Sequence, residues 1–271
     1  MKKRIIGIIG GGNMGEALIK GFMKNMFSKL ISILVFEANP VRVNVLKKRY
    51  KISYEKHMRT LISKADIIIL AVKPQDMPAL LPWFKNDDVI EDKLVISIAA
   101  GLTTKFFEKH LGNKARVVRA MPNMPALEGE SITAICKGLF ATMADLKQAH
   151  LILCAIGEVI VVEEKQMDAI TAVSGSGPAY VFLFVEQWIA AAISLGLSEK
   201  DAQDLVYKTL VGSAHLMAKS GLDVRGLRER VTSKGGTTEA AMKIFLKGNV
   251  FSKLIKTALT AAKKRAKEIA K

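Results

Sequence analysis

Cysteine and histidine are scarce in this 271-residue chain, which contains two cysteines and four histidines. Cys136 and Cys154 have neither the spacing of a zinc site nor that of a redox motif. The histidines fall in no catalytic motif and are expected at surface or structural positions. These absences argue against a metal centre and against a disulfide-rich secreted fold, and they favour a reduced, cytoplasmic protein.

Acidic and aromatic residues are also few. The 41 lysines and arginines outnumber 25 acids, giving a net charge of +16, and aromatic residues make up 6% of the chain. About half of the excess charge lies in residues 243–271, where lysines alternate with Leu254, Ile255 and Leu259 as on a solvated helix face. No nucleic-acid motif and no interleaving of basic and aromatic residues is present. We therefore expect no nucleic-acid partner, and we expect the positive field to attract an anionic cofactor or substrate.

Long apolar runs are limited to two places. Residues 5–9 form a short run that passes into glycines and then Glu16, which is unlike a signal peptide. The run Tyr180–Leu197 carries Glu186 and Gln187 near its middle, so a helix in a protein or dimer core is expected rather than a membrane span. We expect no membrane partner.

Short apolar runs alternate with helical patterns in the first part of the chain. The predicted strands cover residues 4–9, 31–36, 67–72, 94–99, 116–119, 132–135 and 158–162. The predicted helices cover residues 13–24, 40–50, 57–63, 104–111 and 143–155. This alternation predicts an α/β fold with a Rossmann-type, doubly wound, mostly parallel sheet. Helical periods alone follow, so we predict a dinucleotide-binding domain over residues 1–162 and an all-helical domain over residues 163–271.

The first predicted strand leads directly into a glycine-rich turn and a helix. Gly10-x-Gly12-x-x-Gly15 has the spacing of a dinucleotide-binding loop, in which the first glycine turns the chain, the second admits the pyrophosphate and the third packs helix on strand. The helix N-terminus adds an anion site. The predicted cofactor-binding residues here are Ile9, Gly10, Gly11, Gly12, Asn13, Met14 and Gly15.

The second predicted strand ends at the position that selects the cofactor. Glu37 lies 22 residues beyond Gly15, where a carboxylate would bond the ribose 2′-hydroxyl and favour NADH. Arg42 is near enough to favour NADPH, and a surface residue capping the turn is the alternative for Glu37. The balance favours NADH, and the choice between NADPH and NADH stays open.

Three further loops follow consecutive predicted strands. Ligands of doubly wound sheets lie outside the carboxyl ends of the strands, so these loops are expected to line the nicotinamide side. For any one of them alone, ordinary loop chemistry is an equal alternative, whereas three in succession favour a binding role. The predicted cofactor-binding residues are Ala71, Val72, Lys73, Pro74, Ala99, Ala100, Gly101 and Asn123.

A second glycine-rich turn opens a helix in the last part of the chain. Exposed N–H groups and the helix dipole would make an anion site there for a small carboxylate, and an ordinary helix cap is the alternative. The predicted substrate-binding residues are Ser233, Gly235, Gly236, Thr237 and Thr238.

Together these motifs resemble the pyrroline-5-carboxylate reductases. The matching runs, in the family's order, are residues 9–15, 71–74, 97–101, 119–123, 173–180 and 232–238. The first run is shared by many dehydrogenases, whereas the last two in combination are specific. The resemblance covers essentially the whole chain; Lys234 departs from it, because the family usually has proline there.

The resemblance implies a cytoplasmic enzyme that reduces 1-pyrroline-5-carboxylate to L-proline, the last step of proline biosynthesis, with NADPH or NADH. It implies a helical C-terminal dimerisation domain, with dimers often assembled into decamers. It places the Ser233–Thr238 loop at the substrate carboxylate and Thr238 near the ring nitrogen. We expect Thr238 and Lys73 to be catalytic; simple capping and a solvent-exposed strand-end lysine are their alternatives.

Three other functions stay open at this point. One is a reductase of the same architecture for a different imine or oxo acid. A second is a nucleotide sensor that binds cofactor without turnover, which the intact Gly235–Thr238 run disfavours. The third is a nucleic-acid binder, which charge alone supports.

Overall fold

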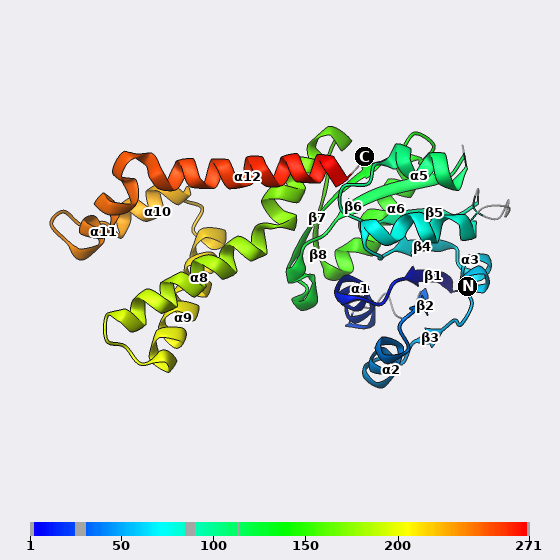
Figure 1. Ribbon diagram of the computed structural model, residues 1–271, viewed down its shortest axis with the longest axis horizontal. Helices are drawn as coiled ribbons and strands as arrows, with labels where there is room; N and C mark the ends of the chain where they lie inside the picture. Colours follow the sequence, from blue (N-terminus) through cyan, green and yellow to red (C-terminus); the bar gives the residue numbers. More distant parts are fainter. Residues whose placement is uncertain (1–2, 25–30, 85–89, 91, 113, 270–271) are drawn as a thin grey trace. The chain divides into compact units, whose positions relative to one another are not determined.

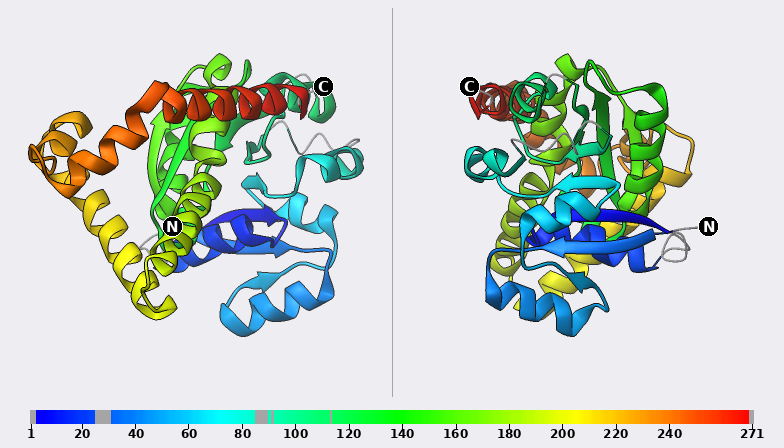
Figure 2. Two further views of the ribbon diagram at one scale, coloured as in Figure 1. Left: turned by 60° about the vertical axis from the view of Figure 1, so that its left-hand side comes forward. Right: turned by 90° about the vertical axis from the view of Figure 1, so that its right-hand side faces the viewer.

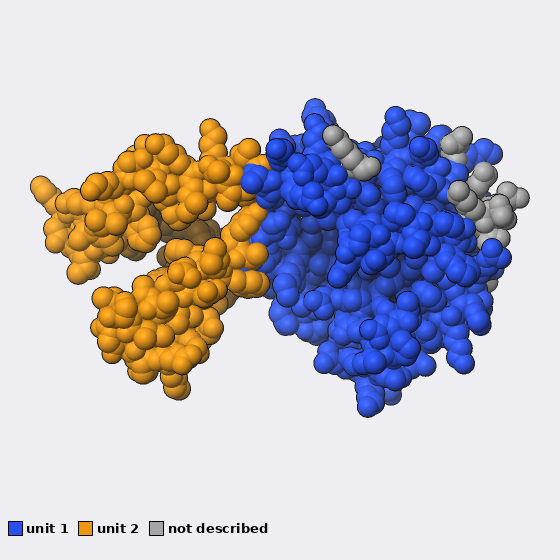
Figure 3. All heavy atoms as spheres, viewed as in Figure 1, with its two compact units in different colours: residues 1–178, 261–271 blue, residues 179–260 orange. Residues whose placement is uncertain are grey.

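The computed structural model describes residues 3–24, 31–84, 90, 92–112 and 114–269. The chain forms two compact units, residues 1–178 with 261–271, and residues 179–260 (Figure 3). All described strands lie in the first unit. The division into functional domains after residue 162 stays a prediction.

The first unit is built on an eight-stranded sheet (Figure 1). Its strand order is β3-β2-β1-β4-β5-β6-β7-β8, and every described pair is parallel except β6 with β7. The strands are β1 Arg4–Ile9, β2 Ile31–Phe36, β3 Ser53–Tyr54, β4 Ile67–Leu70, β5 Leu94–Ser97, β6 Arg116–Met121, β7 Ser131–Lys137 and β8 Gly157–Val161. This confirms the predicted doubly wound, mostly parallel sheet. The order reverses between β1 and β4, and such a switch point opens a crevice at the carboxyl ends of the strands.

Helices cover both faces of the sheet (Figure 2). Those of the first unit are α1 Asn13–Lys24, α2 Pro40–Arg49, α3 Met58–Lys64, α4 Met77–Leu80, α5 Thr104–Leu111, α6 Met143–Leu153 and α7 Met167–Ile170. Short 3-10 turns are η2 Pro74–Asp76, η3 Leu81–Phe84, η5 Met124–Glu128, η6 Cys154–Ile156 and η7 Glu164–Gln166, and a π-helical turn η8 spans Thr171–Gly175.

Strand side chains alternate between two buried cores. Ile67 and Ile69 of β4 pack in one core with α1 and α6, whereas Ile68 and Leu70 pack in the other with α3 and α5. Both faces are therefore apolar, which explains why these strands have continuous runs of Ile, Leu and Val rather than alternating polar residues.

The second unit is helical throughout. α8 Gly177–Ser194 enters it, and α9 Glu199–Lys219, α10 Val224–Arg230, α11 Thr237–Leu246, η9 Lys247–Asn249 and most of α12 Val250–Ile269 complete it. α8 exposes large apolar side chains, among them Phe182 and Leu183. Residues Glu164–Ser194 are long and apolar enough to cross a membrane, a criterion that core helices of soluble proteins also meet. In a single chain α8 buries Val185 and leaves many of its apolar side chains exposed, so the predicted core position is not reached within one chain.

Candidate dinucleotide and substrate sites

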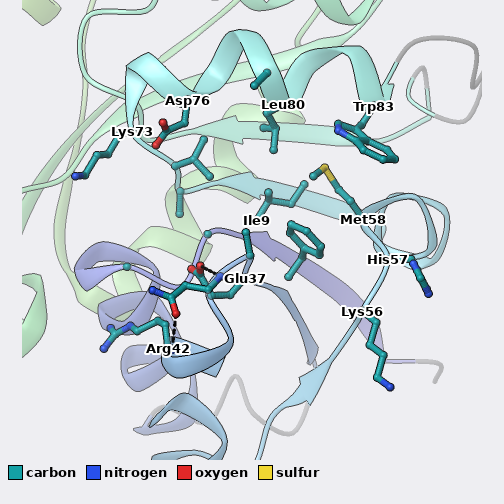
Figure 4. A pocket seen from close by; sticks show the side chains of 18 of the residues that line it. Ile9, Glu37, Arg42, Lys56, His57, Met58, Lys73, Asp76, Leu80 and Trp83 are labelled. Atoms are coloured by element: carbon teal, nitrogen blue, oxygen red, sulfur yellow. Dashed lines mark hydrogen bonds between the residues drawn. The ribbon is translucent and has the colours of Figure 1, made fainter. Parts of the chain in front are cut away.

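A cavity of about 1160 Å³ opens at the carboxyl ends of β1, β2 and β4 (Figure 4). It lies at the switch point of the sheet, where doubly wound folds bind nucleotides. Of the predicted cofactor-binding residues, it is lined by Ile9, Gly10, Gly12, Asn13, Glu37, Ala71, Val72 and Lys73. The structure thus brings together residues from three separate loops.

The glycine loop has the geometry that a pyrophosphate requires. Gly10 has a φ of 104°, and a Cβ there would lie 2.5 Å from the carbonyl oxygen of Ala71. A Cβ at Gly15 would lie 2.1 Å from the carbonyl oxygen of Gly10, so the helix packs directly on the turn. No described atom lies within 4 Å of the Cβ position at Gly12, which faces open space. These residues therefore fit a dinucleotide at the start of α1.

Glu37 and Arg42 meet at the backbone of Gly11. The amide N–H groups of Gly11 and Asn39 donate to the Glu37 carboxylate, at 2.6 and 2.8 Å. Arg42 Nε donates to the carbonyl oxygen of Gly11 at 2.6 Å. A carboxylate and a guanidinium therefore stand at the same end of the cavity, each with its position fixed by the loop.

Behind Arg42 lies a second carboxylate that sequence reasoning missed. Glu16, in the first turn of α1, accepts from Arg42 Nη2, from Arg49 Nη1 at 2.9 Å and from the Tyr50 hydroxyl at 3.0 Å. Burial raises the pKa of Glu16, but the hydrogen bonds from Arg49, Arg42 and Tyr50 outweigh it and hold the pKa below its ordinary value. The group is therefore ionised at neutral pH. Only Arg42 and Arg49, seven residues apart on α2, hinted at a shared acidic partner.

The loop after β4 carries the predicted catalytic lysine. Lys73 lines the cavity just before η2, which Pro74 opens. Figure 4 shows Lys73 at one side of the cavity and Trp83 at the other. Lys73 thus stands where positive potential would act on a bound dinucleotide.

The opposite side of the cavity is lined by residues that the motifs did not indicate. They include Met58 and Leu80, which are buried, and Trp83, whose ring lies 5.9 Å from the Arg59 guanidinium. Their apolar surface suits a nucleotide base. The one signal available in the sequence was their place after strands, because Met58 follows β3 and Leu80 and Trp83 follow β4. No group of three His, Cys, Asp or Glu side chains among the described residues is placed to hold a metal ion.

A smaller hollow of about 270 Å³ adjoins the glycine loop through Asn13 and Met14. Ile98 and Asn123 line it, together with Gly175 of the π-helical turn. The Asn123 side-chain oxygen accepts from the Ile132 backbone amide at 3.1 Å. The side chain of Asn123 therefore also holds the loop that follows β6.

The residues predicted to contact the cofactor at the end of β5 do not line the large cavity. Ala99 is buried in the core, and a Cβ at Gly101 would lie 2.7 Å from Ile269 of α12. Ile98 is the residue of this segment that faces a hollow. The cofactor role of Ala99, Ala100 and Gly101 stays a prediction.

The second glycine-rich turn lies in the second unit. As predicted, α11 begins at Thr237, with Gly236 as its N-cap and Gly235 at a φ of 75°. The Gly235 amide donates to Glu239 at 2.9 Å, and this hydrogen bond, together with Lys243, holds the pKa of Glu239 below its ordinary value. Glu239 was not anticipated as a carboxylate at this helix start.

Comparisons with known proteins match both halves of the chain. The family model "Pyrroline-5-carboxylate reductase dimerisation" matches residues 164–269, and "NADP oxidoreductase coenzyme F420-dependent" matches residues 5–101. The pyrroline-5-carboxylate reductase of Mycobacterium tuberculosis is 35% identical over 97% of this chain and 96% of its own length. That of Methanosarcina acetivorans is 35% identical over the full length of both chains.

Solved structures give the same result. The Plasmodium falciparum pyrroline carboxylate reductase with NADP bound superposes with a TM-score of 0.88 at 31% identity, covering 100% of both chains. The pyrroline-5-carboxylate reductase of Coxiella burnetii superposes with a TM-score of 0.87 at 36% identity, again over 100% of both.

Proposed function

This chain belongs to the pyrroline-5-carboxylate reductase family, and on that premise we propose that it reduces 1-pyrroline-5-carboxylate to L-proline with NADPH or NADH. The observation that carries the proposal is the presence, in one chain, of both halves that the reaction needs. One is a dinucleotide cavity at a sheet switch point, and the other is a glycine–threonine turn at a helix start. The reaction is the last step of proline biosynthesis, and we place it in the cytoplasm.

The bound nicotinamide supplies the hydride, and the protein orients the two rings. Residues Gly10–Gly15 hold the pyrophosphate against the start of α1, where Gly12 leaves the approach open. Asn13 and Met14 link this loop to the hollow that Asn123 lines, which is where we place the nicotinamide. Lys73 adds positive potential at the same edge of the sheet.

The Ser233–Thr238 turn is assigned to the substrate carboxylate. Gly236, the N-cap of α11, offers no side-chain cap to the first N–H groups of the helix, and the helix dipole favours an anion there. We assign the Thr238 hydroxyl to the ring nitrogen. An imine is protonated more easily than a ketone, so a hydroxyl suffices where no histidine or carboxylic acid is assigned.

The homo-oligomer that the dimerisation domain indicates is proposed to be a dimer joined through the second unit. The apolar surface of α8, including Phe182 and Leu183, is the kind of surface that a partner covers. A pentamer of dimers is the proposed larger assembly. This function needs neither a nucleic-acid nor a membrane partner.

The test is the loss of absorbance at 340 nm with 1-pyrroline-5-carboxylate, using NADH and NADPH separately. Turnover with either supports the proposal. Cofactor binding without turnover would refute it in favour of a sensor or of a reductase for another imine or oxo acid.

The matched variants are Thr238→Ala and Thr260→Ala, the latter in the exposed face of α12. We expect Thr238→Ala to lower kcat about 10²-fold, the lower end of what a positioned proton donor contributes. Thr260→Ala is expected to leave kcat unchanged. Equal kcat in both variants would remove the assigned role of Thr238.

A further inference from the structure

The buried carboxylate of Glu16 has no part in the reaction proposed above. Its side chain is only 8% exposed, although it directly follows Gly15, the last residue of the glycine loop, in the first turn of α1. A buried charge is retained only when it is paired, and here two guanidinium groups and a phenol pair with it.

Helix α2 positions Arg42 beside this carboxylate. The Asn39 side chain caps the helix by accepting from the amides of Val41 and Arg42, and Pro40 fixes its first residue. Arg42 and Arg49 are seven residues apart, so both project from one face of the helix. The helix start lies only three residues after Glu37, which couples the position of Arg42 to the end of β2.

The guanidinium of Arg42 is held at two points. Nε donates to the Gly11 carbonyl at 2.6 Å, and Nη2 donates to Glu16. The N–H of the same Gly11 donates to Glu37 at 2.6 Å. The backbone of Gly11 therefore holds both the Glu37 carboxylate and the Arg42 guanidinium at the ribose end of the cavity.

This geometry distinguishes the two cofactors. A ribose 2′-hydroxyl can donate to the Glu37 carboxylate, whereas a 2′-phosphate there meets a like charge and needs a cation. Gly11 and Glu16 engage Nε and Nη2 of Arg42, so a bidentate contact of Arg42 with a 2′-phosphate competes with Glu16 for Nη2. If Arg42 left Glu16, Arg49 would be the one guanidinium partner of that carboxylate. Figure 4 shows Lys56 and His57 at the other side of the cavity, with their side chains directed away from Glu37 and Arg42.

We propose that Glu16 is a positioning residue for cofactor choice: it holds Arg42 against the glycine loop, leaves Glu37 to bind the ribose, and so makes the chain select NADH over NADPH. The proposal rests on the proposed function only in taking the cavity to hold a nicotinamide dinucleotide. It concerns affinity and not turnover, so binding measurements test it directly.

The experiment is a set of titrations on the full-length chain. NADH and NADPH are followed by nucleotide fluorescence, and ADP and 2′,5′-ADP by calorimetry as probes that carry no hydride. We expect the wild-type chain to bind NADH at least about tenfold more tightly than NADPH, equivalent to about 1.4 kcal/mol. In Glu16→Gln, we expect NADPH affinity to rise at least about fivefold, with NADH within about twofold of wild type.

Two controls separate this effect from a general structural one. Tyr50→Phe removes a partner of Glu16 without freeing Arg42, and it is expected to leave the NADH to NADPH ratio unchanged. Arg42→Ala is expected to leave the ratio unchanged in the wild-type background but to abolish the gain in NADPH affinity in the Glu16→Gln background. Should Glu16→Gln fail to fold, the NADH to NADPH ratio of Arg42→Ala in the wild-type background tests the proposal. A loss of NADPH affinity in that variant would show that Arg42 already binds the 2′-phosphate.

A wild-type preference for NADPH that Arg42→Ala removes would overturn the proposal, because Arg42 would then already bind the 2′-phosphate. An unchanged ratio in folded Glu16→Gln would also overturn it. NADH-selective binding without reduction of 1-pyrroline-5-carboxylate would instead refute the proposed function and leave this inference standing.

Discussion

Two glycines of the same loop, three residues apart, are expected to respond to alanine in opposite ways. At Gly12 no described atom lies within 4 Å of the new Cβ, whereas at Gly15 the Cβ would lie 2.1 Å from the Gly10 carbonyl oxygen. Gly12→Ala therefore adds a methyl group to the space assigned to the pyrophosphate. Gly15→Ala adds one to a packed contact between helix and turn.

The magnitudes follow from these contacts. Relief of the contact at Gly15 requires the backbone to shift, and overpacking of this kind costs about 1–3 kcal/mol. For a chain of this size that lowers Tm on the order of 5 °C. Gly12 is the N-cap of α1, because its carbonyl accepts from the Glu16 amide. Alanine is a poorer N-cap than glycine, so Gly12→Ala lowers the free energy of unfolding by about 0.5 kcal/mol. A methyl group at the pyrophosphate should weaken NADH and NADPH binding by about tenfold or more, equivalent to at least about 1.4 kcal/mol.

The assay pairs thermal unfolding, followed by circular dichroism, with fluorescence titration of both nucleotides. We expect Gly12→Ala to lose affinity at nearly wild-type Tm and Gly15→Ala to lose Tm. Wild-type affinity in Gly12→Ala would refute the assignment of this loop to the pyrophosphate. An equal fall of Tm in both variants would show that Gly12 is structural.

Two further predictions concern buried groups of the first unit. Arg119 of β6 is 2% exposed and pairs with Glu164 at 3.3 Å and with Asp168 at 3.6 Å. Arg119→Leu should therefore lower the free energy of unfolding by about 3 kcal/mol, measured by urea denaturation, because it leaves two carboxylates without their cation; a change below about 1 kcal/mol would contradict this. For the thiols, burial, then the nearby Glu164, raises the pKa of Cys136 to about 12, with Arg119 acting in the opposite direction, whereas Cys154 is exposed. A disulfide reagent at pH 8 should therefore modify one thiol in the native chain and the second only after unfolding.

The sequence predicted the features that local patterns determine. The apolar runs at residues 4–9 and 31–36 became β1 and β2 with these bounds, and the helix expected from Thr104 to Leu111 is α5. The glycine spacing and the position of Glu37 placed one edge of the cavity, because the carboxyl ends of parallel strands share that edge. The strand predicted to Val72 ends at Leu70, which leaves the residues that follow free to line the cavity.

Features set by long-range pairing could not be predicted in this way. β3 has only two residues, which is too short for a pattern of apolar residues. It forms through parallel pairing with Leu34 and Val35 of β2. β7 is antiparallel to β6, although its composition is that of the parallel strands. The partners of Glu16 lie 26 to 34 residues away along the chain, so only the folded structure brings them to that carboxylate.

The two halves of the proposed site differ in what a single chain can hold in place. The cofactor half lies in a unit with two large cores, whereas α10 and α11, which flank the Ser233–Thr238 turn, bury no residue in the single chain. A partner is therefore expected to fix that turn. Phe182→Asp, at an exposed position of α8, should yield a monomer by light scattering that binds NADH with wild-type Kd but has lost turnover. A monomeric variant with wild-type kcat would show that one chain suffices for the substrate half.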